Sequence, residues 1–163
     1  MAKEWGTIPD HLAKFAMDQK VFFIASVAGD DDVNLSPKGV AGLKVIDEKS
    51  VLYADYHGSG DQTSKHLSAG GKATLVFMSF DEKPLIVRFY SKGRIVAKGA
   101  EEFDKLAGEY YSGFDKSEFR RIFIFDVYRV QTSCGYGVPV MEYKRDRSSK
   151  PYFNELFIPF PEG

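Results

Sequence analysis

The sequence has little cysteine, no long hydrophobic run and almost no net charge, and each absence excludes a class of protein. One cysteine, Cys134, stands among 163 residues, so no disulfide can form within the chain. No window approaches the roughly 18 consecutive apolar residues of a membrane-spanning helix, and the first residues lack the apolar segment of a secretory signal. We therefore predict a cytoplasmic protein that associates with no membrane.

Other absences bear on chemistry. A net charge of -1 argues against a nucleic-acid-binding protein that relies on a broad positive surface. His11, His57 and His66 do not have the spacing of a metal site, so we expect none. Cys134 has no accompanying histidine and acid in a recognisable pattern, and no hydrolase motif is present. If the protein performs chemistry, a bound cofactor is expected to supply it.

What the sequence does contain is aromatic and apolar residues. Hydrophobic residues make up 44% of the chain, with 14 phenylalanines and 9 tyrosines. Aromatic residues favour strands and interfaces, so a β-rich fold that associates with itself is expected. The length fits one domain, which we place at residues 1–143, followed by a tail at 144–163 that packs on the domain or on a partner subunit.

Hydrophobic periodicity predicts the order of the elements. Short helices are expected over residues 10–17, 61–69 and 101–111, where apolar side chains recur on one face. Apolar and alternating runs predict strands over 21–28, 33–36, 43–46, 51–55, 73–80, 85–97 and 121–131. Strands and helices do not alternate regularly, which argues against a doubly wound parallel sheet. A mainly β (α+β) fold, an antiparallel barrel with peripheral helices, fits better.

Two segments contain groups that could bind an anion. The first ends a strand and consists of Ser36, Pro37, Lys38 and Gly39. Its hydroxyl and ammonium could hold a phosphate or a polar ring edge. Taken alone, an ordinary Pro-Gly turn with a solvated lysine is the commoner explanation.

The second segment is a Gly-Ser-Gly loop before a helix, with side-chain donors at Ser59, Gln62 and Thr63. Free backbone N–H groups at a helix start favour an anion, and the alternative is a simple helix cap. Asp61 would repel a phosphate unless its carboxylate points away as the cap.

Two further segments are less specific. Arg88 lies inside an apolar strand, where its guanidinium needs a partner. That partner is either a carboxylate such as Asp55 or a phosphate or carbonyl of a ligand. Gly135 and Tyr136 belong to a Cys-Gly-Tyr-Gly run, whose small and flexible residues let the backbone pass close to a flat or bulky group.

Taken in order, these segments resemble one family. The runs VNLSPKG, LYADYHGSGDQTSKHL, PLIVRFYSKGRI and VYRVQTSCGYGVP are similar to the FMN-binding proteins related to pyridoxamine 5'-phosphate oxidase, over roughly residues 5–143. The resemblance implies a six-stranded antiparallel split β-barrel that dimerises, with FMN at the interface between two identical subunits. It places residues 36–39 against the flavin ring or ribityl chain, and it assigns the phosphate to Ser59, Gln62 and Thr63, helped by Lys38 and Arg88.

Two departures from the oxidase limit what the resemblance implies. Gln62 and Thr63 stand where the oxidase carries an Arg-Lys pair, and the segment that grips pyridoxal phosphate is absent. The expected function is therefore an FMN-dependent oxidoreductase acting on an unknown small molecule. Two alternatives stay open: a non-catalytic protein that binds or senses flavin or haem, and a deazaflavin-dependent reductase.

Overall fold

The computed structural model describes residues 2–58 and 60–146. Ser59, one of the predicted phosphate ligands, and residues 147–163, most of the predicted tail, lie outside the described residues. Within the described part, no helix has the length and apolar character needed to cross a membrane.

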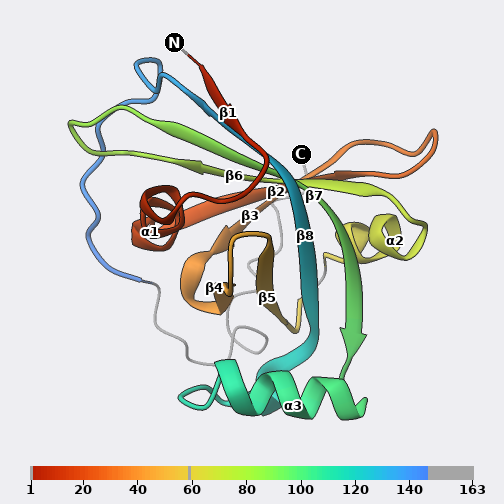
Figure 1. Ribbon diagram of the computed structural model, residues 1–163. Helices are drawn as coiled ribbons and strands as arrows, with labels where there is room; N and C mark the ends of the chain where they lie inside the picture. The colour runs from red at the N-terminus through yellow and green to blue at the C-terminus, as the bar shows by residue number, and fades with distance from the viewer. Residues whose placement is uncertain (1, 59, 147–163) are drawn as a thin grey trace, which may run out of the picture.

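The described residues form eight strands, which make one antiparallel sheet that curls into a half-barrel (Figure 1). Its order is β3-β2-β6-β7-β8-β5-β4, and β1 pairs with β8. The strands are β1 (Lys3–Trp5), β2 (Val21–Val27), β3 (Asn34–Gly39), β4 (Leu43–Val45), β5 (Ser50–Tyr56), β6 (Lys72–Met78), β7 (Ile86–Ala97) and β8 (Phe119–Ser133). The predicted mainly β antiparallel split barrel is confirmed. The seven strands predicted from the sequence are all present, and β1, of three residues, adds one that was not predicted.

Between residues 2 and 146, three helices and two 3-10 turns surround the sheet. The helices are α1 (Asp10–Asp18), α2 (Gln62–Ser68) and α3 (Glu101–Tyr110), and the turns are Val40–Gly42 and Lys116–Glu118. All three helices were predicted, and α3 lies across one end of the sheet (Figure 1). The predicted stop of α2 is confirmed at Gly70, whose φ of 75° suits only glycine well. At Gly71 a Cβ would stand 2.3 Å from the carbonyl oxygen of Val27, so the turn into β6 also requires glycine.

The core has two parts, one on each face of the central strands. Alternation along β8 sends Phe123 and Phe125 into the larger cluster with α1, and Ile122 into the smaller cluster with α3. This confirms the alternation predicted for the last strand. β8 pairs with β1, β5 and β7. Its pairing with β5 places the first residues of β8 beside the last residues of β5.

Candidate functional site

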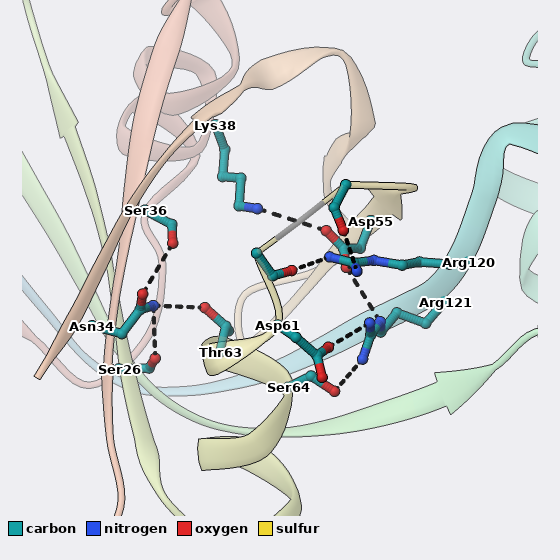
Figure 2. Close-up of polar contacts among 12 residues, drawn as sticks. Ser26, Asn34, Ser36, Lys38, Asp55, Asp61, Thr63, Ser64, Arg120 and Arg121 are labelled. Carbon is teal, nitrogen blue, oxygen red and sulfur yellow. Dashed lines mark hydrogen bonds and ion pairs between the residues drawn. The ribbon is translucent and has the colours of Figure 1, made fainter. Parts of the chain in front are cut away.

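Four parts of the chain meet at one shallow pocket. β3, the end of β5, the loop before α2 and the start of β8 converge there (Figure 2). The pocket has about 210 Å³ of space open to solvent, and its lining is Ser36, Lys38, Asp55, Gly60, Asp61, Gln62, Thr63, Ser64 and Phe123. The lining therefore combines one ammonium group with several hydroxyls and two carboxylates.

The wall formed by β5 and β8 is built on a buried carboxylate. The Asp55 side chain is 3% exposed, and three cations surround it. Arg120 Nε lies 2.7 Å and Arg121 Nε 3.2 Å from Oδ2, and Lys38 Nζ lies 3.6 Å from Oδ1. The register pairs Asp55 with Arg121 directly, beside an irregularity that lets Arg120 approach as well. A carboxylate buried in this way requires such partners to offset its desolvation.

The terminal nitrogens of the two arginines donate to the loop and to α2. Arg120 donates to the backbone oxygens of Gly58, at 2.9 Å, and Gly60. Arg121 donates to the Asp61 carboxylate at 2.6 Å and to the hydroxyl of Ser64. Each nitrogen of both guanidinium groups thus has a protein partner, and the pair fastens the loop to the sheet.

This arrangement settles the orientation of Asp61. Asp61 is the N-cap residue of α2, but its side chain accepts no capping hydrogen bond. Its carboxylate instead points to Arg121 (Figure 2). The expected capping role is therefore not observed, because the stronger charged partner on β8 draws the side chain away.

Lys38 is the cation that lines the pocket. Within the described residues, its ammonium has only the 3.6 Å contact to Asp55 and a position 5.8 Å from the centroid of the Tyr53 ring. Its side chain is 20% exposed. Lysine carries three donors, so Lys38 can bind an anion in the pocket without breaking the Asp55 cluster.

The opposite wall is a network of largely neutral groups between β2, β3 and α2. His66 is fully buried, and its Nδ1 lies 2.9 Å from the hydroxyl of Ser26. Asn34 Nδ2 donates to Ser26 Oγ at 3.2 Å and to Thr63 Oγ1 at 3.0 Å, as Figure 2 shows. The hydroxyl of Ser36 donates to Asn34 Oδ1 at 3.3 Å. Asn34 therefore joins three hydroxyl groups at the edge of the pocket.

A surface carboxylate closes this network. Asp31 Oδ2 accepts from Gln62 Nε2 at 2.8 Å and lies 3.1 Å from His66 Nε2. The backbone N–H of Asp32, and then His66, hold the pKa of Asp31 below its ordinary value. The carboxylate is thus kept ionised and acts only as an acceptor.

Serine, histidine and aspartate in contact are also the components of a hydrolytic triad, but their setting here is different. Ser26 is 3% exposed, and its oxygen already accepts the amide of Asn34. A nucleophile must reach its substrate, whereas this hydroxyl is covered by its neighbours. The group therefore contributes positioning and stability.

The structure divides the predicted site residues into two groups. Ser36, Lys38, Gln62 and Thr63 line the pocket together. Gly39 is the last residue of β3 and has open space where a Cβ would stand. Pro37 lies between Ser36 and Lys38 on β3 and is exposed.

The second group lies at the far end of β8. Arg88 is opposite Gln131, ten residues beyond Arg121 and so about 30 Å further along the strand at roughly 3.3 Å per residue. Arg88 donates to the hydroxyl of Ser133 at 2.9 Å. Asp55, which we considered as its carboxylate partner, instead belongs to the Lys38 cluster.

The other two residues predicted from the last segment accompany Arg88. At Gly135 a Cβ would stand 2.7 Å from the backbone nitrogen of Leu85, so the predicted close approach of the backbone is to the β6–β7 turn. Tyr136 is 84% exposed. Within one chain, therefore, these residues do not reach the pocket.

Sequence reasoning missed Asn34, His66, Arg120 and Arg121 as parts of the site. The two arginines gave a usable signal, because adjacent guanidinium groups at the start of an apolar strand need partners for the same reason as Arg88. Asn34 and His66 gave none, since their roles depend on the packing of α2 against β2 and β3.

The curled antiparallel sheet with peripheral helices defines the class of the protein as a split barrel. The family model described as pyridoxamine 5'-phosphate oxidase matches residues 8–134. The chain belongs to this family. The match covers the pocket, both of its walls and Arg88.

A sequence match to a curated protein of the same family supports this assignment. Pyridoxamine 5'-phosphate oxidase family protein ustO of Aspergillus flavus is 33% identical over 156 residues, which is 90% of this chain. The chain spans 61% of the length of that relative.

Solved structures share the fold. A single-residue variant of HupZ from Group A Streptococcus has a TM-score of 0.62 at 20% identity, over 77% of this chain and 99% of that chain. A putative pyridoxamine 5'-phosphate oxidase from Lactobacillus delbrueckii has a TM-score of 0.62 at 13% identity, over 77% and 94%. Other matches include an FMN-binding protein from Syntrophomonas wolfei, with a TM-score of 0.51 at 18% identity over 74% and 84%, and the haem storage protein HutZ from Vibrio cholerae, with 0.50 at 12% over 74% and 89%.

Proposed function

We propose that the protein binds FMN, with the phosphate and the adjoining ribityl chain in the pocket between β3 and α2, and that it acts as an oxidoreductase. The observation that carries this proposal is the donor set of the pocket. The spare ammonium of Lys38 faces the same space as the hydroxyls of Ser36 and Thr63. An ammonium beside hydroxyl groups suits a phosphate ester next to a polyol.

The size of the pocket supports binding between two subunits. Its enclosed space of about 10 Å³ is far below the roughly 300 Å³ at which small-molecule sites begin. One chain alone therefore offers a shallow surface to the phosphate and does not enclose the flavin ring. A second copy of the chain would cover the ring, and we assign Arg88, Gly135 and Tyr136 of that copy to this task.

A partly exposed apolar row offers a surface for the second copy. The register aligns Pro37, Phe23, Val76 and Arg88 across β3, β2, β6 and β7, on the side opposite the larger core. Leu35, two residues from Pro37 on the edge strand, is 61% exposed. Apolar side chains gathered on one face of a sheet are typical of homodimer contacts.

The chemistry would be divided between cofactor and chain. Bound FMN supplies hydride transfer, and the protein supplies binding, orientation and the electrostatic surroundings. Lys38 would neutralise part of the phosphate charge, and the Asp55 cluster would keep the loop in place. No nucleophile or acid–base pair is assigned. The substrate and the electron donor would both be small molecules, selected by the space on the open side of the flavin ring. We place this activity in the cytoplasm, because the single Cys134 excludes disulfides within the chain.

Titration with FMN and with riboflavin tests the binding proposal. We expect saturable binding with about one FMN per subunit and a clear preference for FMN over riboflavin. Lys38→Gln should lower that preference about tenfold, as expected for one charge-assisted contact. Lys105→Gln, an exposed lysine on α3, is the matched control and should leave it unchanged. Equal affinity for FMN and riboflavin, or no binding, would refute the assignment, and haem and deazaflavin would be titrated next.

Two further measurements test the remaining parts. Sedimentation at micromolar concentration should show a dimer, and a monomer would contradict the shared site. Rapid reduction of bound flavin by a reduced nicotinamide, followed by turnover with an electron acceptor, should identify an oxidoreductase. Bound flavin that no reductant turns over would instead indicate a binding or sensing protein.

A further inference from the structure

Five residues form one continuous chain of hydrogen bonds from the surface to the pocket. The chain runs from Asp31 through His66, Ser26 and Asn34 to Thr63. Every hydrogen bond needs one donor and one acceptor. The direction of the first bond therefore restricts the direction of each bond that follows.

The direction is set at Asp31. An ionised carboxylate can only accept, so Nε2 of His66 must carry the hydrogen that faces it at 3.1 Å. Gln62 Nε2 lies 3.1 Å from the same ring nitrogen because both groups donate to the same carboxylate oxygen. In the neutral imidazole, Nδ1 is then left with a lone pair.

The remaining bonds follow from this lone pair. The hydroxyl of Ser26 must donate to Nδ1 of His66, and its oxygen then accepts from Asn34 Nδ2. The amide nitrogen of Asn34 consequently faces inward, and its second hydrogen goes to Thr63 Oγ1 at 3.0 Å. The hydrogen of the Thr63 hydroxyl has no acceptor among the described residues, and Thr63 lines the pocket.

We propose that this chain of hydrogen bonds fixes Thr63 as a donor into the pocket and makes Asp31 a positioning residue for the phosphate group of the ligand. The inference rests on the proposed function and deepens it. Asn34 Oδ1 meanwhile accepts from Ser36. Ser36 therefore presents lone pairs to the pocket and suits a ligand hydroxyl, as in a polyol chain beside the phosphate.

Asp31→Asn gives a test in which two explanations predict opposite signs. Removing a negative charge near a phosphate site should strengthen FMN binding if electrostatics alone decide. The hydrogen-bond chain predicts weaker binding, because an amide can also donate and no longer fixes the tautomer of His66. Asp30→Asn is the matched control: it removes the same charge one residue away, from an exposed side chain with no hydrogen bond in the described residues.

The measurement is the ratio of FMN affinity to riboflavin affinity. Thr63→Val, which removes the donor itself, should lower this ratio about tenfold, and Asp31→Asn should lower it about threefold. Asp30→Asn should leave it unchanged or raise it slightly. If Asp31→Asn raises the ratio as Asp30→Asn does, the positioning role is wrong.

A second readout does not depend on flavin binding. Nitrogen-15 NMR of the imidazoles in the ligand-free protein reports which ring nitrogen carries the hydrogen. We expect protonated Nε2 and bare Nδ1 for His66 in the unaltered chain, and a mixture in Asp31→Asn. Hydrogen on Nδ1 in the unaltered chain would overturn the inference, whatever the chain binds. The expected tautomer together with no preference for FMN would overturn the proposed function instead and leave the hydrogen-bond chain standing.

Discussion

The two walls of the pocket keep buried polar groups in place by different means. On the β5–β8 side, three cations converge on the Asp55 carboxylate, whose side chain is 3% exposed. On the β2–β3 side, a fully buried imidazole, an amide and three hydroxyls satisfy one another, and the ionised Asp31 carboxylate lies at the outer end. Both walls hold the segment around the start of α2, one through Asp61 and Ser64 and the other through Thr63.

The difference between the walls indicates that some polar residues hold the pocket in shape while others are available to a ligand. The two arginines look like the obvious anion ligands, yet all their nitrogen groups already have protein partners. Neither arginine is among the residues that line the pocket, where a ligand phosphate would lie. The lining residues with a donor group left for a ligand include Lys38 and Thr63. The charged wall thus holds the pocket in shape, and the neutral wall together with Lys38 contacts the ligand.

The largest effect is expected from Asp55→Asn. It leaves three cations around a group without charge, and breaking a buried ion pair costs about 3 kcal/mol of unfolding free energy. Urea denaturation measures the loss. Added salt should reduce it, because screening relieves the repulsion among the unpaired cations.

The control for Asp55 is Glu102→Gln, which removes the exposed partner of Arg94. Exposed ion pairs contribute less than about 1 kcal/mol. If the two substitutions cost the same, Asp55 is not the structural centre of its wall.

A somewhat smaller effect is expected from breaking the neutral wall with His66→Phe. An aromatic ring is kept, but Ser26 loses its acceptor inside the protein, and an unsatisfied buried hydroxyl costs about 2 kcal/mol. The loss should not depend on salt, in contrast to that of Asp55→Asn. His11→Phe, at an exposed position on α1, should cost little. A salt-dependent loss for His66→Phe would mean that the two walls do not differ as described.

Tyr111→Phe calibrates the value of one neutral buried hydrogen bond outside the pocket. The Tyr111 hydroxyl donates to the backbone oxygen of Gly42 at 2.9 Å, and burial raises the pKa of this phenol. Removing it should cost about 1 kcal/mol, since the carbonyl loses its partner. Tyr110→Phe is the control and should show almost no change, because the pKa of this phenol is raised by the neighbouring Glu109 carboxylate at the surface and no buried carbonyl among the described residues depends on its hydroxyl. A loss for Tyr111 as large as that for His66→Phe would leave no reason to treat the neutral wall as a network.

Local patterns predicted much of the fold, because α1, α3 and the long strands repeat apolar residues at the period of their own structure. β1 was missed, since three residues show no alternation and the strand exists only through its pairing with β8. In the site, Lys38 and Thr63 could be identified because they flank glycine-rich turns. The partners that orient them could not, because contacts such as Asn34 with Thr63, or Asp55 with Arg120, join residues 29 and 65 positions apart.

The smallest expected effect is on the pH dependence of stability, and it compares the Asp31 carboxylate with the neutral amide of Asp31→Asn. The pKa of Asp31 is lowered, first by the backbone N–H of Asp32 and then by His66. A lowered pKa in the folded state means that the carboxylate adds stability above its unfolded pKa of about 3.9, and that this contribution is lost as the pH falls through the lower folded value. Asp31→Asn should therefore be less stable than the unaltered protein at pH 5, and the difference should shrink toward zero as the pH approaches 3.

Measuring the difference between the two proteins is essential for this experiment. The pKa values of Asp47, Asp81 and Asp115 are lowered as well, so the total acid sensitivity reports several carboxylates. These groups are common to both proteins and cancel in the subtraction. A difference that stays constant from pH 5 to pH 3 would show that Asp31 is not stabilised as an anion. The neutral wall would then lack the fixed acceptor from which the direction of its hydrogen bonds follows.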